Sequence, residues 1–191
     1  IIHDFYGFPQ ALFDVQYPAP GNPELAKLIL DLLNPESVHL DNERGLDHGV
    51  WSVLQPMYPA ADIPVLQLSL DRTRNAASHY ELAKKLRPLR EQGILIVGSG
   101  NIVHNLRAMR FGGTPQDFAV EFDQMFAKRL QDRDLKSLAD REGLGPLLRM
   151  AHPTVDHYMP ALTIAGASDA RDSLTFMTDA IDLGSVSMRS F

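Results

Sequence analysis

The most restrictive pattern in this chain is a short apolar run, Ile94–Val97, followed at once by Gly98-Ser99-Gly100. Four consecutive aliphatic residues bounded by glycines are typical of a strand that is buried on both faces. The glycines allow the backbone to turn sharply directly after that strand. We therefore expect His104 just beyond the carboxyl end of a sheet strand, which is the edge where ligands bind in open α/β sheets.

Turn and helix signals place this strand in an alternating pattern of strands and helices. A second apolar run, Pro64–Leu70, precedes a helical stretch that Asn75 can cap and that Gly93 can close, with Pro88 expected to kink or split it. The order strand, helix, strand predicts a βαβ unit with parallel strands. The predicted fold class is therefore α/β: one domain over residues 1–191, with a central mixed, largely parallel sheet flanked by helices.

The other elements follow from hydrophobic periodicity and from capping residues. No internal repeat or linker divides the chain, which favours a single domain. Helices are expected at residues 24–33, 50–57, 114–129, 135–142, 146–150 and 155–165, a short strand at 37–40, and an edge hairpin built from 173–180 and 184–189.

Charge and composition narrow the classes of partner and of metal site. The net charge is −6 and no basic run is present, which argues against a nucleic-acid surface. No apolar stretch reaches 18 residues and no signal peptide is visible, so we expect a cytoplasmic protein without a membrane partner. The chain has no cysteine and seven histidines, so a transition-metal site here uses imidazoles and carboxylates, as Fe(II), Mn(II) or Zn(II) sites do.

Three segments place a histidine beside Gly, Asp or Pro and are candidates for chemistry. They are Asp47-His48-Gly49, the run from Gly100 to Asn105 with His104, and the run from His152 to Pro160 with His157. None shows the i, i+4 histidine spacing of a helical metal clamp, so the residues alone leave a structural role open for each. The glycines before His104 lack a dinucleotide fingerprint or a P-loop lysine, and no Gly-x-Ser-x-Gly elbow occurs.

Longer motifs carry a family resemblance across essentially the whole chain. They are Gly100-Asn101-Ile102-Val103-His104-Asn105-Leu106, His3-Asp4-Phe5-Tyr6-Gly7-Phe8-Pro9, Gly45-Leu46-Asp47-His48-Gly49-Val50-Trp51 and His157-Tyr158-Met159-Pro160-Ala161-Leu162, with shorter matches at residues 17–21, 65–69 and 184–189. Together they resemble the 4,5-DOPA-extradiol-dioxygenase type of the class III extradiol ring-cleavage dioxygenases.

The resemblance implies a reaction, a metal and roles for individual residues. Members of this family open the ring of a catechol with O₂ at a non-haem Fe(II), and some hold Zn(II) instead. By resemblance, His104 is the active-site histidine, as metal ligand or as general base, and His157 is a metal ligand. His48 is implied to line the catechol pocket as a catalytic group, and Phe5, Tyr6 and Trp51 are candidates for an aromatic wall or for core packing.

The same family carries two more metal-binding histidines in an N-terminal segment, in a His-Gly-Ser-Pro and a Ser-Ala-His-Trp motif. Neither motif occurs in these 191 residues, so the resemblance implies that this chain supplies at most half of the family's metal site and lacks the first strands of its sheet. Two alternatives therefore stand beside the dioxygenase hypothesis: a non-catalytic α/β binding protein with a degenerate metal site, and a zinc-dependent hydrolase.

Overall fold

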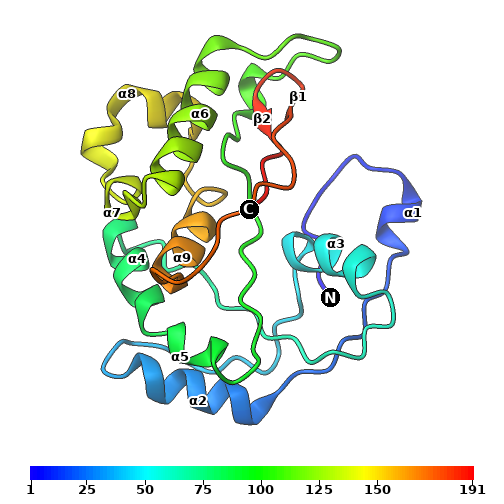
Figure 1. The fold of residues 1–191 in the computed structure, drawn as a ribbon. Coiled ribbons are helices and arrows are strands. Elements are labelled where there is room, and N and C mark those ends of the chain that lie inside the picture. The colour runs from blue at the N-terminus through cyan, green and yellow to red at the C-terminus, as the bar shows by residue number, and fades with distance from the viewer. The chain divides into compact units, whose positions relative to one another are not determined.

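The structure is a computed structural model that describes all 191 residues, and the chain forms two compact units (Figure 1). Unit 1 comprises Ile1–Ser69 and unit 2 comprises Leu70–Phe191. Both units are rich in helix, and one two-stranded sheet is present. None of the helices is both long and apolar enough to cross a membrane.

Unit 1 contains three helices, and side-chain caps set the starts of the two longer ones. Helices α1, α2 and α3 span Gln10–Phe13, Pro23–Leu33 and His48–Met57. The Asn22 side chain accepts from the backbone N–H of Leu25 at 3.0 Å, which confirms the predicted start of α2. The Asp47 side chain caps α3 in the same way, so this helix begins at His48, two residues before its predicted start.

Unit 2 contains the other helices, and three of its predicted boundaries are confirmed. The Asn75 side chain caps α4. In the region of Pro88 the helical stretch is divided into two separate helices, α4 and α5. Gly93 follows α5 and has a φ of 75°. Helix α8 is interrupted at Gly145, where φ is 54° and ψ is −138°, and its second segment contains the short helix predicted at 146–150. The helices are α4 (Ala76–Lys84), α5 (Arg87–Arg90), the 3₁₀ turn η1 (Leu106–Ala108), α6 (Asp117–Gln131), α7 (Leu135–Leu138), α8 (Arg141–Ala151) and α9 (Met159–Ala167).

The core of unit 2 is formed by side chains from α4, α6, α7, α8 and α9, and α4 packs directly against α9. Phe122 and Phe126 of α6 are fully buried, and both rings meet Tyr158, which directly precedes α9. Beside α6 lies the predicted hairpin, in which β1 (Ile181–Asp182) pairs antiparallel with β2 (Val186–Ser187) (Figure 1). The hairpin is therefore confirmed in part: β2 lies within the predicted strand 184–189, but β1 follows the predicted strand 173–180, and no larger sheet lies beside the pair.

The central, largely parallel sheet predicted from the sequence is not shown by the structure. The runs 37–40, 64–70 and 94–97 carry no strand, and the only sheet is the β1–β2 pair. A strand needs a neighbour that takes up its backbone N–H and C=O groups. Residues 95–99 make no backbone hydrogen bond, and Leu95 and Val97 are 65% and 47% exposed. The strand predicted at 94–97 is therefore not observed, because no paired strand lies beside it.

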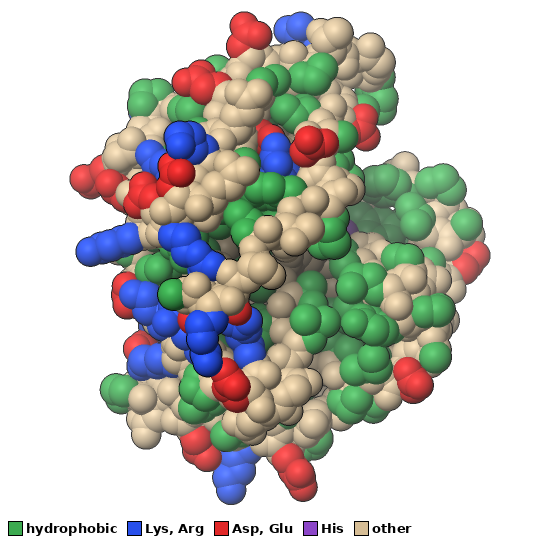
Figure 2. Space-filling view, in the orientation of Figure 1, with side chains coloured by type: hydrophobic (Ala, Val, Ile, Leu, Met, Phe, Trp, Pro, Cys, Tyr) green, Lys and Arg blue, Asp and Glu red, His purple; other side chains and the backbone are tan.

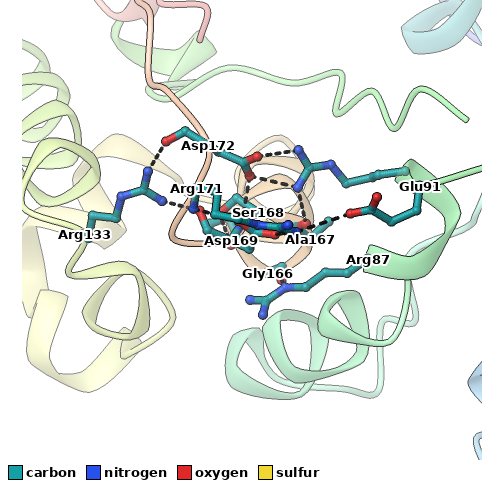
Figure 3. A network of polar contacts seen from close by, with 11 residues as sticks. Arg87, Glu91, Arg133, Gly166, Ala167, Ser168, Asp169, Arg171 and Asp172 are labelled. Carbon is teal, nitrogen blue, oxygen red and sulfur yellow. Dashed lines mark hydrogen bonds and ion pairs between the residues drawn. The ribbon is translucent and has the colours of Figure 1, made fainter. Parts of the chain in front are cut away.

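Arginine side chains hold the segment that follows α9 (Figure 3). Arg87 donates to the carbonyl of Gly166, and Arg90 donates to the carbonyl of Ala167 and to both carboxylate oxygens of Asp172. The Arg90 guanidinium lowers the pKa of Asp172 to about 2. These contacts satisfy carbonyls at the carboxyl end of a helix. Basic and acidic side chains are interspersed on this face (Figure 2), so we interpret the cluster as structural.

Candidate functional site

Residues 101–105, which carry His104, are held by hydrogen bonds to three other segments of unit 2. The backbone of this segment is therefore fixed although it belongs to no helix or strand. The bonds join Asn101 N to His157 O (3.1 Å), His104 N to Ala151 O (2.9 Å), Asn105 N to Ser185 O (3.2 Å) and Ser187 N to Val103 O (2.9 Å).

The structure brings His104 and His157 together, although 52 residues separate them in the chain. Their rings are stacked, with centroids 3.5 Å apart and planes within 6° of parallel. The absence of a side chain at Gly100 allows this approach, because a Cβ there would collide with the carbonyl oxygen of His157. Gly100 therefore lies directly against the backbone of the segment that carries His157.

The His104 ring is held in its neutral form. Burial lowers the pKa of His104 to about 4, the charge on His157 acts in the same direction, and Asp156 opposes them. A neutral imidazole at pH 7 has a lone pair that can accept a proton or bind a metal. The electrostatics of the pair therefore suit both roles that were left open for His104.

Asn101 orients the second ring of the pair. Its amide nitrogen donates to the carbonyl of Ser187 at 2.9 Å, which leaves its amide oxygen facing Nδ1 of His157 at 3.2 Å. The Asp156 carboxylate lies 3.8 Å from Nε2 of the same ring. Outer partners of this kind fix the orientation and tautomer of a histidine ligand. Sequence reasoning missed Asn101, although it lies within the motif that contains His104.

His152, in the same motif as His157, is a buried structural neighbour of the pair. Its ring is 2% exposed, Nε2 lies 2.7 Å from the carbonyl oxygen of Ile102, and Nδ1 has no partner. Burial lowers the pKa of His152 to about 4. Because the carbonyl can only accept, Nε2 carries the proton and donates, and His152 thereby anchors the segment that leads to His104.

His48, the third candidate, lies in unit 1 and pairs with a carboxylate. Its Nδ1 is 2.6 Å from an Asp4 carboxylate oxygen, and its backbone N–H also points to that oxygen at 3.3 Å. The Phe5 ring meets the imidazole edge-on at 5.7 Å, whereas Trp51 is 2% exposed and belongs to the core of unit 1. Asp4 was not identified as a site residue from the sequence, although it lies in a quoted motif.

The donor types in unit 2 suit a divalent transition metal, but their number is small. Imidazole nitrogens bind Fe(II) and Zn(II) well, and open catalytic sites of this kind use three protein ligands. No group of three or more histidine, aspartate or glutamate side chains converges in the structure. The chain thus presents part of a ligand set, with His104 and His157 as its imidazoles.

Comparison with known proteins agrees with the resemblance read from the motifs. The chain is 46% identical to a protein of Escherichia coli (strain K12) named 4,5-DOPA dioxygenase extradiol, over 99% of this chain and 72% of that protein. It is 37% identical to a protein of the same name from Beta vulgaris, over the whole of this chain and 72% of that protein. The resemblance is therefore confirmed.

A solved structure and a family model lead to the same assignment. A crystal structure of an uncharacterized protein from Escherichia coli K12 matches with a TM-score of 0.82 and 42% identity, over 93% of this chain and 75% of that chain. Residues 1–182 match the model described as the catalytic LigB subunit of aromatic ring-opening dioxygenase. Because the family model covers most of the chain and the relatives share up to 46% identity with it, the chain belongs to the LigB family of ring-cleavage dioxygenases.

Proposed function

We propose that this protein is a cytoplasmic, non-haem Fe(II)-dependent extradiol dioxygenase that opens the ring of a DOPA-like catechol with O₂. The observation that carries the proposal is the stacked His104–His157 pair, built from two motifs of the family. A small catechol and O₂ are then the only partners that the reaction requires. Zn(II) is the alternative occupant of the same imidazoles in the isolated protein.

The stacking favours different roles for the two rings. An imidazole nitrogen binds a metal through a lone pair that lies in the plane of the ring. Rings that are 3.5 Å apart and nearly parallel offer lone pairs in two separate planes, so one ion cannot lie in both. We assign the metal to His157, whose orientation Asn101 fixes, and proton transfer to His104.

The environment of His104 supports its role as the general base. Its lowered pKa keeps a ring nitrogen unprotonated at pH 7, ready to accept the proton of a catechol hydroxyl and later return it. Half-burial restricts the water that could compete for that nitrogen. A bound Fe(II) supplies Lewis acidity and a template for catechol and O₂. His48 is proposed as a second catalytic group that hydrogen-bonds the substrate.

The proposal is tested by oxygen uptake with DOPA, using the natural full-length protein loaded anaerobically with Fe(II). The wild type is expected to consume O₂ and form a yellow ring-opened product. His104→Ala should lower turnover by about 10²- to 10⁴-fold, the usual contribution of a general base, while the circular dichroism spectrum stays unchanged. His39→Ala, which changes an exposed histidine of unit 1, serves as the matched control. Unchanged turnover in His104→Ala would overturn the assignment.

The short ligand set is the one observation that favours the alternatives. A non-catalytic binding protein would retain no stoichiometric iron in the natural full-length product, and a zinc-dependent hydrolase would cleave an ester or amide without O₂ uptake. Metal content and O₂ uptake, measured on one preparation, therefore separate the three functions.

A further inference from the structure

Asp4 and His48 in unit 1 are joined by a short hydrogen bond. The distance from Nδ1 of His48 to the carboxylate oxygen is 2.6 Å, and hydrogen bonds to an ionised carboxylate are shorter than those between neutral groups. The same oxygen accepts from the backbone N–H of His48, the first residue of α3. Partial burial opposes ionisation of Asp4, but the hydrogen bonds from His48 outweigh it and lower the carboxyl pKa below its ordinary value.

This geometry sets the tautomer of His48. An ionised carboxylate can only accept, so Nδ1 must carry the proton that it donates. In the neutral ring Nε2 is then the acceptor, with its lone pair directed away from Asp4. A carboxylate behind an imidazole fixes both the tautomer and the orientation of the ring in many acid–base sites.

The exposure of the pair argues against a purely structural role. The side chains of His48 and Asp4 are 46% and 42% exposed, and ion pairs with that exposure contribute little to folding stability. Elsewhere in unit 1, buried side chains such as Trp51 and Tyr17 form the core. The pair is therefore ordered at the surface without being needed by the core.

Two aromatic rings connect His48 to the surface. The Phe5 ring meets the His48 ring edge-on at 5.7 Å, and the Phe8 ring meets the Phe5 ring edge-on at 5.4 Å. Phe8 is 55% exposed. An aromatic surface next to a hydrogen-bond acceptor suits a ligand that has an aromatic face and a hydroxyl group.

We infer that Asp4 is a positioning residue that holds His48 as the Nδ1–H tautomer, so that Nε2 of His48 accepts a hydrogen bond from a phenolic hydroxyl of the substrate. The inference rests on the proposed function, because it needs a phenolic substrate. It adds a residue and a specific nitrogen atom to the role assigned to His48.

The test combines a spectroscopic readout with steady-state kinetics on the natural full-length protein. The ring nitrogens of ¹⁵N-histidine-labelled protein report the tautomer, and the His48 signals are identified by their loss in His48→Gln. Asp4→Asn is expected to reduce the Nδ1–H population and to lower kcat for DOPA by about 10- to 100-fold. Asp4→Glu, which keeps the carboxylate, should recover part of both. Asp14→Asn removes an exposed carboxylate bound to Gln10 in the same unit and should change neither.

Parallel measurement of His104→Ala separates failure of this inference from failure of the proposed function. If His104→Ala is inactive while Asp4→Asn keeps both the wild-type kcat and the wild-type ¹⁵N signals, the role of Asp4 is wrong and the dioxygenase proposal stands. A change in kcat without a change in tautomer would also contradict it. If the wild type shows no ring-opening activity, both proposals fall.

Discussion

The two histidine groups of this protein are built in opposite ways. In unit 2, the half-buried rings of His104 and His157 stack on each other. Backbone hydrogen bonds hold the segment that carries His104. In unit 1, His48 lies at the surface, and the carboxylate of Asp4 orients it. One group depends on the packing of its unit, whereas the other depends on a single side-chain contact.

The difference shows how the same residue type is adapted to different tasks. Burial and a neighbouring imidazole lower the pKa of His104 and keep its ring neutral, which suits proton transfer near pH 7. A carboxylate behind His48 fixes which nitrogen carries the proton. We therefore expect changes in unit 2 to alter stability and function together, and changes at Asp4 to alter function alone.

The largest loss of stability is expected from substitution of Gly100, which packs against the backbone of His157. In Gly100→Ala the new Cβ would collide with a backbone oxygen, which cannot move aside as a flexible side chain can. We expect a loss of about 3 kcal/mol in the free energy of unfolding, measured by urea denaturation. Gly21→Ala in unit 1, where a Cβ meets nothing within 4 Å, should cost no more than about 0.5 kcal/mol. Equal losses in the two variants would contradict the packing described for unit 2.

The buried ring of His152 should make the free energy of unfolding depend on pH. The folded-state pKa of about 4 lies below the ordinary value of 6.5, so between these values the unfolded chain binds more protons than the folded chain. The stabilisation is complete above about pH 6.5 and is lost as the pH falls towards 4, by about 3 kcal/mol in total. Urea midpoints from pH 7 to 4 measure this loss.

The variant His152→Leu keeps the buried volume and removes the titrating ring. It should show a shallower decline over the same window, with a residual slope from His104, whose pKa is shifted in the same direction. At pH 7 it should be about 2 kcal/mol less stable than wild type, because the carbonyl of Ile102 loses its donor. A decline as steep as that of the wild type would exclude His152 as its source.

Loss of the Asn101 amide should weaken metal binding by His157. In Asn101→Ala the contact that orients His157 is gone, and second-shell losses of this kind cost about 10- to 100-fold in affinity. Calorimetric titration of Zn(II) into the natural full-length protein measures the effect, with Asn42→Ala in unit 1 as the control. Wild-type affinity in Asn101→Ala would show that the ring keeps its orientation without the amide.

The smallest stability effect is expected at the exposed pair. Asp4→Asn should change the free energy of unfolding by no more than about 1 kcal/mol, because both side chains are solvated. Urea denaturation beside Gly100→Ala gives the direct contrast between the two regions. A loss above about 2 kcal/mol would mean that the pair supports the fold of unit 1, which would break the comparison.

Local signals in the sequence predicted the helices well. Asn22 and Asn75 were identified as caps, Pro88 as a break and Gly93 as a helix end, and the structure has each of them. These features depend on interactions within a few residues of the chain, which a sequence displays directly. The start of α3 was missed by two residues because the cap at Asp47 was read as part of a turn.

The candidate site was predicted in part. His104, His157 and His48 were identified from their motifs, whereas Asn101 and Asp4 were missed as partners. An asparagine or aspartate in a loop has many roles, and only its contacts show which ring it orients. The assignment of catalytic and metal roles to the three histidines stays a prediction, as does the single domain over residues 1–191.

Motifs, caps and composition are properties of neighbouring residues, so the family, most of the helix ends and the available functional groups could be predicted from the sequence. The structure alone decided which distant residues meet. In the structure, His104 stacks on His157 and Asp4 is hydrogen-bonded to His48. The apolar run Ile94–Val97 has no strand partner. Contacts of this kind join segments far apart in the chain, and they form only when packing brings both backbones to the same place.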